Sequence, residues 1–274
     1  MIVTRDRWPT LRRTLAELRG LREGASVVVV DNGSATPPPA GLCRQVGLVR
    51  VKRDIGAAAR NLGVNVLSTP YVAFSDDDSW WAPNALGLAG DLLDLHPRLG
   101  LIAARVLVGE DRRMDQTCSR MANSPLPPAP DDVGRPVLGF VACGAIVRRS
   151  AFLAHGGFAR RYGFGGEEEL LALDLADGGW WLRYVPEIVA HHHPSPAHDR
   201  RGRARCQVRN ALWSAWLRRP AGPAIGRSAR LLKGAGSDRG PAFVAALAGL
   251  PWVLADRRVI APAIERQLRL LDRE

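Results

Sequence analysis

The sequence has few cysteines, few lysines and no long apolar run. Its four cysteines are Cys43, Cys118, Cys143 and Cys206. They are far apart and form no Cys-x-x-Cys pair, so they signal neither a zinc site nor a disulfide framework and favour a reduced, cytoplasmic location. Residues 1–10 carry charges and lack the apolar segment of a signal peptide. The longest apolar run, residues 243–255, contains a proline and is too short to cross a bilayer.

Only two residues, Lys52 and Lys233, are lysines, so nearly all of the positive charge is arginine. The net charge of +11 is unevenly spread, because residues 199–274 hold 16 Lys+Arg against 6 Asp+Glu while the first 198 residues are close to neutral. A basic segment is typical of proteins that bind phosphate, nucleic acid or an anionic membrane surface. A genome rich in Ala, Gly and Arg codons would give the same composition. No recognition motif with interleaved aromatics is present, so we expect no nucleic-acid partner.

Short apolar runs alternate with leucine-rich segments of helical period. Strands are expected at 1–4, 27–30, 48–51, 71–74, 99–108, 137–147, 180–185 and 188–190, and helices at 8–20, 57–67, 84–96, 149–155 and 167–175. This alternation predicts an α/β fold, doubly wound, with a mixed, mainly parallel sheet and flanking helices. At 274 residues the chain can form one large domain or a domain with an appendage.

The composition divides the chain near residue 198. We expect a catalytic domain over 1–198, made of a nucleotide-binding half (1–108) and an acceptor half (109–198), and a basic helical region over 199–274. Residues 109–136 are rich in proline and show no usable period, which is typical of a long functional or mobile loop.

The most informative stretch is the apolar run 71–74, which ends in Asp76, Asp77 and Asp78. Three adjacent acids are costly to ionise together unless water or a cation screens them. A hard divalent ion that also holds phosphate oxygens would do so, and ligands of α/β sheets bind at the carboxyl ends of strands. An acidic helix N-terminus is the alternative reading of these residues.

In this order, several motifs resemble the inverting nucleotide-sugar glycosyltransferases of family 2, which have the GT-A fold. They are the strand-plus-acid 27–34, the Gly-rich segment 56–63 with Arg60-Asn61, the Asp76-Asp77-Asp78 triplet, Gly156-Gly157-Phe158 before Glu167-Glu168, and Tyr184-Val185-Pro186-Glu187 before His192. The resemblance covers about residues 1–195 and implies transfer of one sugar from a nucleotide-diphosphate sugar to an acceptor hydroxyl with inversion. We also expect a role in cell envelope glycan biosynthesis. The cysteine usage favours a cytoplasmic location, and the basic region favours peripheral association with the inner face of the plasma membrane.

The resemblance implies a role for each matching residue. Glu168 is the general base, which takes the proton of the acceptor hydroxyl. Asp78 is the main ligand of Mg²⁺ or Mn²⁺, with Asp76 nearby, closer to the ribose or to a metal-bound water, and His192 as a third ligand. Asp77 is a structural acid that faces away. The nucleotide-sugar is bound by the side chains of Thr4, Asp31, Arg60, Asn61 and Asp76.

Other interpretations of these residues stay open. Asp31 would also suit a turn acid, Arg60 a surface helix position, and the three-histidine run 191–193 an exposed turn. Trp80, Trp81, Trp180 and Trp181 suit either sugar stacking or core packing. Two departures from the family pattern, Leu170 and Asp174, leave room for a non-catalytic binding or scaffold protein. A metal-dependent nucleotidyltransferase is the remaining alternative, although residues 4–7 lack the glycine-rich loop it would need.

The acceptor expected from the resemblance is a glycan, a lipid-linked molecule or a small molecule. An anionic membrane surface is a further expected partner of the basic region, with Trp213, Trp216 and Trp252 suited to the membrane interface.

Overall fold

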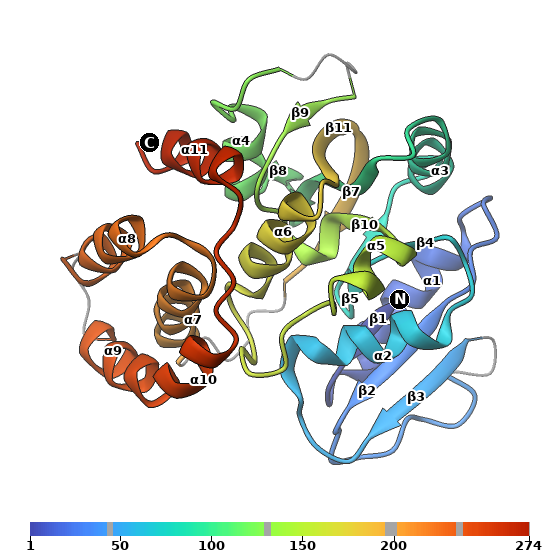
Figure 1. Cartoon of the computed structure of the whole chain (residues 1–274). Coiled ribbons are helices and arrows are strands. Elements are labelled where there is room, and N and C mark those ends of the chain that lie inside the picture. The colour runs from blue at the N-terminus through green and yellow to red at the C-terminus, as the bar shows by residue number, and fades with distance from the viewer. Residues whose placement is uncertain (43–45, 129–132, 195–201, 234–237, 274) are drawn as a thin grey trace.

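The computed structural model describes residues 1–42, 46–128, 133–194, 202–233 and 238–273. Two β-sheets lie next to each other, helices cover them, and a separate group of helices follows at one side of the molecule (Figure 1). The predicted boundary near residue 198 lies outside the described residues.

The first sheet is the predicted parallel sheet. Its strand order is β3-β2-β1-β5, and all three pairings are parallel. The strands are β1 (Ile2–Thr4), β2 (Val28–Asn32), β3 (Gly47–Val51) and β5 (Ser75–Asp76). Three of the expected site residues, Thr4, Asp31 and Asp76, lie at the carboxyl ends of β1, β2 and β5, which meet at one edge of the sheet.

Helices cover both faces of this sheet, as a doubly wound fold requires. On one face Val29 packs with Leu11 and Leu15 of α1 (Trp8–Arg19). On the other face Val30 packs with Val64 of α2 (Ala59–Val66), which the short helix η1 (Gly56–Ala58) precedes. Successive strand residues therefore point to opposite apolar layers, which explains the unbroken valine run in the sequence.

The second sheet is mixed and has seven strands. Its path is β4-β10-β7-β11-β6, with β8 paired to β7 and β9 paired to β11. The strands are β4 (Tyr71–Ala73), β6 (Ser79–Trp81), β7 (Leu99–Val108), β8 (Arg113–Met114), β9 (Arg135–Pro136), β10 (Ala145–Arg148) and β11 (Trp181–His192). The helices around it are α3 (Ala85–Leu95), α4 (Gln116–Ala122), α5 (Arg149–Ala154) and α6 (Glu167–Asp177).

Several sequence-based predictions are corrected here. The run 71–74 does not continue the parallel sheet: β4 pairs antiparallel with β10, and the chain changes sheets at Phe74 before β5 begins. The strand expected at 137–147 is only β10, preceded by the short helix η2 (Ala142–Gly144). The two strands expected at 180–190 are one strand, β11, with a register shift between Val185 and Val189. The segment 109–136 contains β8, α4 and β9 rather than irregular chain alone.

The C-terminal region is helical, as predicted, and packs on the sheet domain. It consists of α7 (Arg203–Arg218), α8 (Ala221–Lys233), α9 (Arg239–Ala248), α10 (Leu250–Ala255) and α11 (Pro262–Leu271). Two of its residues, Ile260 and Leu268, belong to the large hydrophobic core of the sheets. The C-terminal region is therefore held to the sheet domain by apolar packing in the shared core as well as by the covalent chain.

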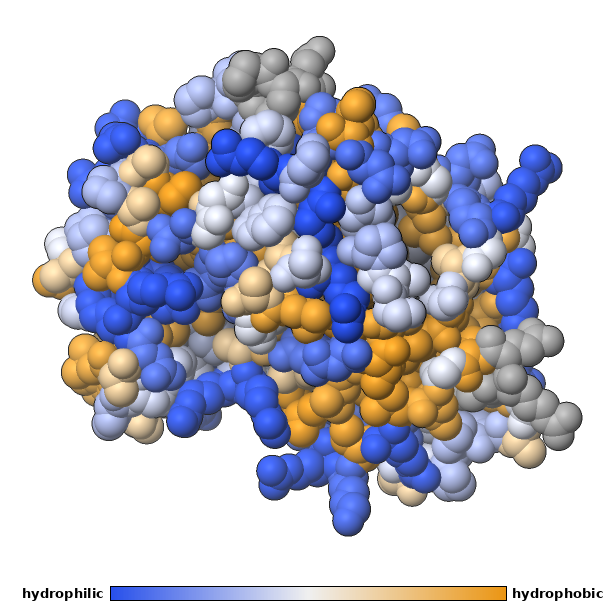
Figure 2. All heavy atoms as spheres, turned by 45° about the vertical axis from the view of Figure 1, so that its right-hand side comes forward, coloured by the Kyte–Doolittle hydropathy of each residue, from blue (hydrophilic) through white to orange (hydrophobic). Residues whose placement is uncertain are grey.

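Two predictions about the basic region need correction. Trp213 is buried at 7% exposure and donates its indole N–H to the Ala246 carbonyl, so it is a core residue of the helical region. Arg218 and Arg219 are also buried, paired with Asp174 and Glu265 respectively. The surface elsewhere mixes charged side chains with apolar ones, and Figure 2 shows a broad apolar area at the lower right of one face. No helix in the described part of the chain is long and apolar enough to span a bilayer.

Candidate active site

The acid triplet lies between β5 and β6, next to the end of β1. Asp77 is 4% exposed, accepts the Thr4 hydroxyl at 2.8 Å and pairs with Arg7 at 2.6 Å. Burial raises the pKa of Asp77 to about 7, against the effect of Arg7 and Thr4, which favour its charged form. Asp77 thus links the triplet to β1 through Thr4 and to the start of α1 through Arg7. The Thr4 hydroxyl, which was expected to contact the nucleotide, donates its hydrogen bond to Asp77.

Asp78 lies between the guanidinium of Arg7 and the imidazole of His192. Its Oδ2 accepts from Arg7 at 2.8 Å and its Oδ1 lies 3.4 Å from Nε2 of His192. Burial raises the pKa of Asp78, but His192 and Arg7 outweigh burial and lower it to about 2. The same pairing raises the pKa of His192, against the effect of its burial. Asp78 is therefore an ionised carboxylate next to an imidazole at neutral pH.

This pair fits a divalent ion that takes its other ligands from a substrate. Mg²⁺ and Mn²⁺ sites at nucleotides use one or two protein ligands and complete their shell with phosphate oxygens and water. Among the described residues, no group of three or more His, Cys, Asp or Glu side chains could hold a metal ion by itself. Asp78 and His192 lie side by side, and Asp76, whose side chain is 34% exposed and accepts from Arg60 through Oδ1, is the other expected ligand.

Asp76 and Arg60 form the next part of the site. Arg60, in α2, donates to Oδ1 of Asp76 at 2.6 Å and is 5% exposed. Its Nε and one Nη are buried and have no hydrogen-bond partner. Burial lowers the pKa of Arg60, and the charges of Asp76, Glu167 and Glu168 more than compensate. A buried guanidinium with two unused N–H groups is suited to bind an anionic oxygen.

Glu168 lies in the first turn of α6, as predicted. Burial raises its pKa, the helix amide N–H group and the charge of Arg60 lower it, and the charge of Asp76 raises it. The charges of Arg60 and Asp76 therefore act on the Glu168 carboxylate. Its neighbour Glu167 is more buried, at 4% exposure, and its Oε2 has no hydrogen-bond partner. Burial and the charge of Glu168 raise the pKa of Glu167 to about 7.

The glycine-rich loop 163–166, which precedes α6, packs against the segment that precedes α2. Gly56 has φ +63° and approaches this loop so closely that a Cβ would lie 2.5 Å from the Gly163 carbonyl oxygen. The Ala57 amide donates to the same carbonyl at 2.8 Å. Only glycine combines this φ with this contact at position 56. Residues 56–57 and the loop 163–166, more than a hundred residues apart in sequence, therefore lie in direct contact.

The family model for glycosyl transferase family 2 matches residues 1–156, which include Arg60 and the acid triplet. This chain belongs to glycosyl transferase family 2. The match ends before α6, so Glu168 lies outside it.

Curated relatives of this family 2 chain include the pre-mycofactocin glycosyltransferase of two strains of Mycobacterium tuberculosis. Each is 32% identical over 218 residues, which is 73% of this chain and 43% of the relative. The chain therefore spans less than half the length of these relatives.

Solved structures share the GT-A fold of this family 2 chain. A mannosyltransferase of Pyrobaculum calidifontis in complex with GDP-Man and Mn²⁺ aligns over 98% of this chain and 83% of its own, with TM-score 0.61 and 18% identity. S. aureus TarS residues 1–349 in complex with UDP-GlcNAc aligns over 92% and 80%, with TM-score 0.65 and 13% identity. At these identities the likeness shows the fold.

Two residues expected to contact the nucleotide in this family 2 protein have structural partners. The Asn61 amide donates to the Phe158 carbonyl and accepts from the Phe158 N–H, both at 2.9 Å. Both ends of its amide are used, so we assign it to holding the 156–158 turn. Asp31 is fully buried, accepts the Ser34 N–H and lies 2.8 Å from Nε of Arg50, which are the contacts of the turn acid given as its alternative.

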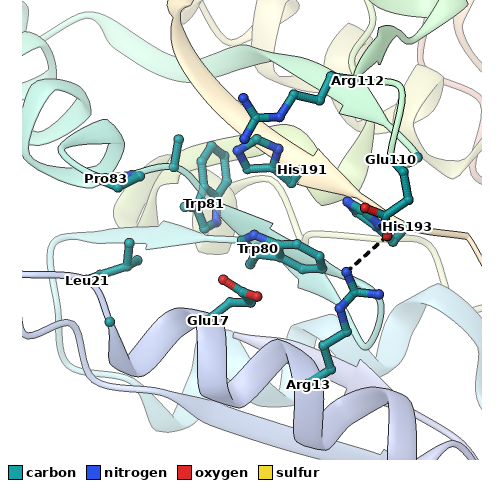
Figure 3. A pocket seen from close by; sticks show the side chains of 13 residues that line it. Arg13, Glu17, Leu21, Trp80, Trp81, Pro83, Glu110, Arg112, His191 and His193 are labelled. Carbon is teal, nitrogen blue, oxygen red and sulfur yellow. Dashed lines mark hydrogen bonds and ion pairs between the residues drawn. The ribbon is translucent and has the colours of Figure 1, made fainter.

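The three histidines at the end of β11 alternate in direction. His192 lies against Asp78, whereas His191 and His193 line a cavity of about 390 Å³ together with Trp80 and Trp81 (Figure 3). Trp80 stacks on His193 with ring centroids 4.7 Å apart. Both tryptophans are buried, which favours core packing over sugar stacking. The cavity lining includes none of Asp78, Arg60 and Glu168, although the His193 amide donates to the Asp78 carbonyl at 2.8 Å, so the cavity adjoins the triplet.

The departures Leu170 and Asp174 have a structural explanation in this family 2 chain. Both lie on α6 and face the C-terminal region: Leu170 packs in a cluster with Tyr162 and Trp213, and Asp174 binds Arg218 through both carboxylate oxygens. Both residues therefore belong to the surface of α6 on which α7 packs.

Sequence reasoning missed two residues of the site. Arg7 bridges Asp77 and Asp78, and Asn210 of α7 donates to the carbonyls of Tyr162 at 3.0 Å and Gly165 at 2.6 Å. Arg7 directly precedes a helix next to a strand end, which was a usable signal. Asn210 lies in a different part of the chain, and no sequence feature links it to the glycine-rich loop.

Proposed function

We propose that the protein is an inverting glycosyltransferase that uses Mg²⁺ or Mn²⁺ and moves one sugar from a nucleotide-diphosphate sugar to an acceptor hydroxyl. One observation carries the proposal: Asp78 lies beside His192, and two residues earlier Asp76 accepts from the buried Arg60, whose charge acts on Glu168. Family 2 membership supports glycosyl transfer over nucleotidyl transfer.

The donor diphosphate is the group that this end of the site suits. A divalent ion held by Asp78 and His192 would stabilise the negative charge that the leaving diphosphate develops. Arg60 would contribute two charge-assisted hydrogen bonds to phosphate oxygens from its free N–H groups. Its contact to Asp76 fixes the guanidinium, so little side-chain entropy is lost when phosphate binds.

Glu168 would activate the acceptor. Its carboxylate accepts the hydroxyl proton while the acceptor oxygen bonds to the anomeric carbon and the bond from that carbon to the phosphate oxygen breaks. Attack from the face opposite the leaving group inverts the anomeric centre, through an oxocarbenium-like transition state. The upward pKa shift that burial gives Glu168 brings a carboxylate closer to the pH at which a general base works best.

The proposal places this reaction in cell envelope glycan biosynthesis, on a glycan, lipid-linked or small-molecule acceptor. It places the protein in the cytoplasm, peripheral to the inner face of the plasma membrane. The excess of arginine over acid in residues 199–274 supports that location.

The test begins with a panel of UDP-, GDP- and dTDP-sugars, scored by thermal stabilisation with Mn²⁺ and with chelator. We expect one donor class to raise the melting temperature only with metal, and Asp78→Asn to abolish that shift. With the donor known, Glu168→Gln should lower kcat by about two or more orders of magnitude with little change in donor affinity.

Glu167→Gln is the matched control, because Glu167 occupies the adjacent position and is also buried. Full activity of Glu168→Gln together with loss of activity in Glu167→Gln would identify Glu167, and not Glu168, as the general base. Full activity of both variants would refute the inverting-base mechanism, and full activity in chelator would refute the metal.

A further inference from the structure

Helices α9 and α10 carry a row of exposed apolar side chains. Its members are Phe243, Val244, Leu247, Leu250 and Leu254, whose exposed fractions run from 36% to 66%. Residues 240–255 contain no charged side chain. The outer face of a surface helix is normally polar. An exposed apolar face of this length therefore indicates a site that binds another molecule or a membrane. Figure 1 shows α9 and α10 at the lower left edge of the molecule.

The row follows helical spacing across both helices. Phe243, Leu247, Leu250 and Leu254 are separated by four, three and four residues, which places them on one face of nearly continuous helix. The opposite face packs inward: Ala246 and Val253 belong to one cluster with Trp213. The α9–α10 face, defined by these exposed residues, is therefore turned away from the fold's own core.

We propose that the α9–α10 face binds the surface of an anionic lipid bilayer, with the apolar row at the level of the acyl chains and headgroups. The proposal rests on the location given under the proposed function and names the surface responsible. Bilayer-surface helices combine a large apolar face with flanking arginine or lysine. Here Arg239 begins α9, and the guanidinium of Arg161 lies 5.3 Å from the ring centre of Trp252 in α10.

The charge around the face favours a bilayer over a second copy of the chain. A two-fold dimer through this face would place the same arginines of two copies opposite one another, and like charges across an interface are repulsive. An anionic surface attracts the same arginines. Residues 240–255 hold no acid that an anionic surface would repel, and the exposed Arg161 lies directly beside Trp252.

The proposal also replaces the residues first expected at the membrane. Trp213 and Trp216 point inward, with their indole N–H groups bonded to the Ala246 carbonyl and the Ser228 hydroxyl. Leucine, valine and phenylalanine of α9 and α10 occupy the outer position instead.

The experiment is co-sedimentation of the full chain with vesicles of phosphatidylcholine alone or mixed with phosphatidylglycerol, without donor or acceptor. We expect binding to the mixed vesicles that weakens with salt. The double variant Leu247→Gln/Leu254→Gln should bind at least about tenfold more weakly, because two apolar side chains no longer enter the bilayer. Glutamine keeps the helix propensity of leucine, so the helices remain formed.

Leu95→Gln is the matched control, since Leu95 ends α3 and is 72% exposed. It should bind as the unmodified chain does. Arg161→Gln should weaken binding to mixed vesicles by about fivefold and leave binding to neutral vesicles unchanged. Sugar transfer to a water-soluble acceptor should be unaltered in all of these variants.

Three results would overturn the proposal: no binding of the unmodified chain to mixed vesicles, equal binding by the double variant, or a dimer in sedimentation that the double variant abolishes. Vesicle binding without any sugar transfer would leave the α9–α10 face standing and remove the proposed function instead.

Discussion

The buried pair Asp174–Arg218 joins the helix of the proposed base to the C-terminal region, and its removal should be costly. Asp174 is 7% exposed and Arg218 9% exposed, and two N–H groups of Arg218 reach the two oxygens of Asp174. Removing one partner of such a pair leaves an uncompensated buried charge, at a cost of about 3–5 kcal/mol. Arg218 also donates to the carbonyls of Leu217 and Asp256, which remain. We therefore expect Asp174→Asn to lower the free energy of unfolding by about 3 kcal/mol, the low end of that range.

A double-mutant cycle measures the coupling. Asp174→Leu/Arg218→Met replaces both charges by apolar side chains of similar size, which is often neutral or stabilising, so the double variant should be more stable than either single variant. The control is Asp111→Asn, because the Asp111–Arg113 pair is 3.9 Å apart with side chains 83% and 77% exposed. It should change stability by less than about 0.5 kcal/mol.

The assay is urea unfolding followed by circular dichroism, with the m-value checked for constancy. A loss below about 1 kcal/mol in Asp174→Asn, or a double variant whose loss equals the sum of the single losses, would refute the reasoning. One cooperative transition is expected, because the C-terminal region contributes Ile260 and Leu268 to the main core.

Three further predictions concern the site. Asn210→Leu leaves the Gly165 carbonyl without its amide donor and should lower stability by about 1–3 kcal/mol and kcat severalfold, with donor KM unchanged; a variant with normal kcat would contradict a positioning role. Arg60→Gln removes a positive charge that lowers the pKa of Glu168, so the acid limb of the pH–rate profile should move to higher pH, and a limb that stays or moves down would contradict the pairing. Thr4→Val should lower activity less than Asp78→Asn, measured as kcat/KM with Mn²⁺, because Thr4 acts through Asp77.

The sequence allowed the parallel sheet and most helices to be predicted because their signals are local. A run such as Val28–Val30 is apolar, short and entirely β-branched, which is typical of a strand covered on both faces. The segment 71–78 was misread because Phe74 continues the apolar run while the backbone changes sheets there. Hydrophobic periodicity indicates which residues are buried but does not identify the neighbouring strand. The pairing of β4 with β10 therefore could not be predicted from it.

The site was predicted in part. The positions of Asp78, His192 and Glu168 followed from ordered motifs, and their roles stay predictions. The contacts of Asn61 and Asn210 could not be predicted, because each joins segments 45 or more residues apart through a single side chain. Such contacts depend on tertiary geometry, which residue type and spacing do not encode locally.

The return of Ile260 and Leu268 to the main core affects how the protein is made. Domains generally fold as units during synthesis, N-terminal parts first. Here the core formed by β7, β10 and β11 is completed by side chains translated more than sixty residues after the last of those strands. Nascent chains that end before Ile260 therefore expose apolar surface of the sheet domain. Slow translation or early termination in that interval should favour aggregation and chaperone binding over a stable, shorter enzyme.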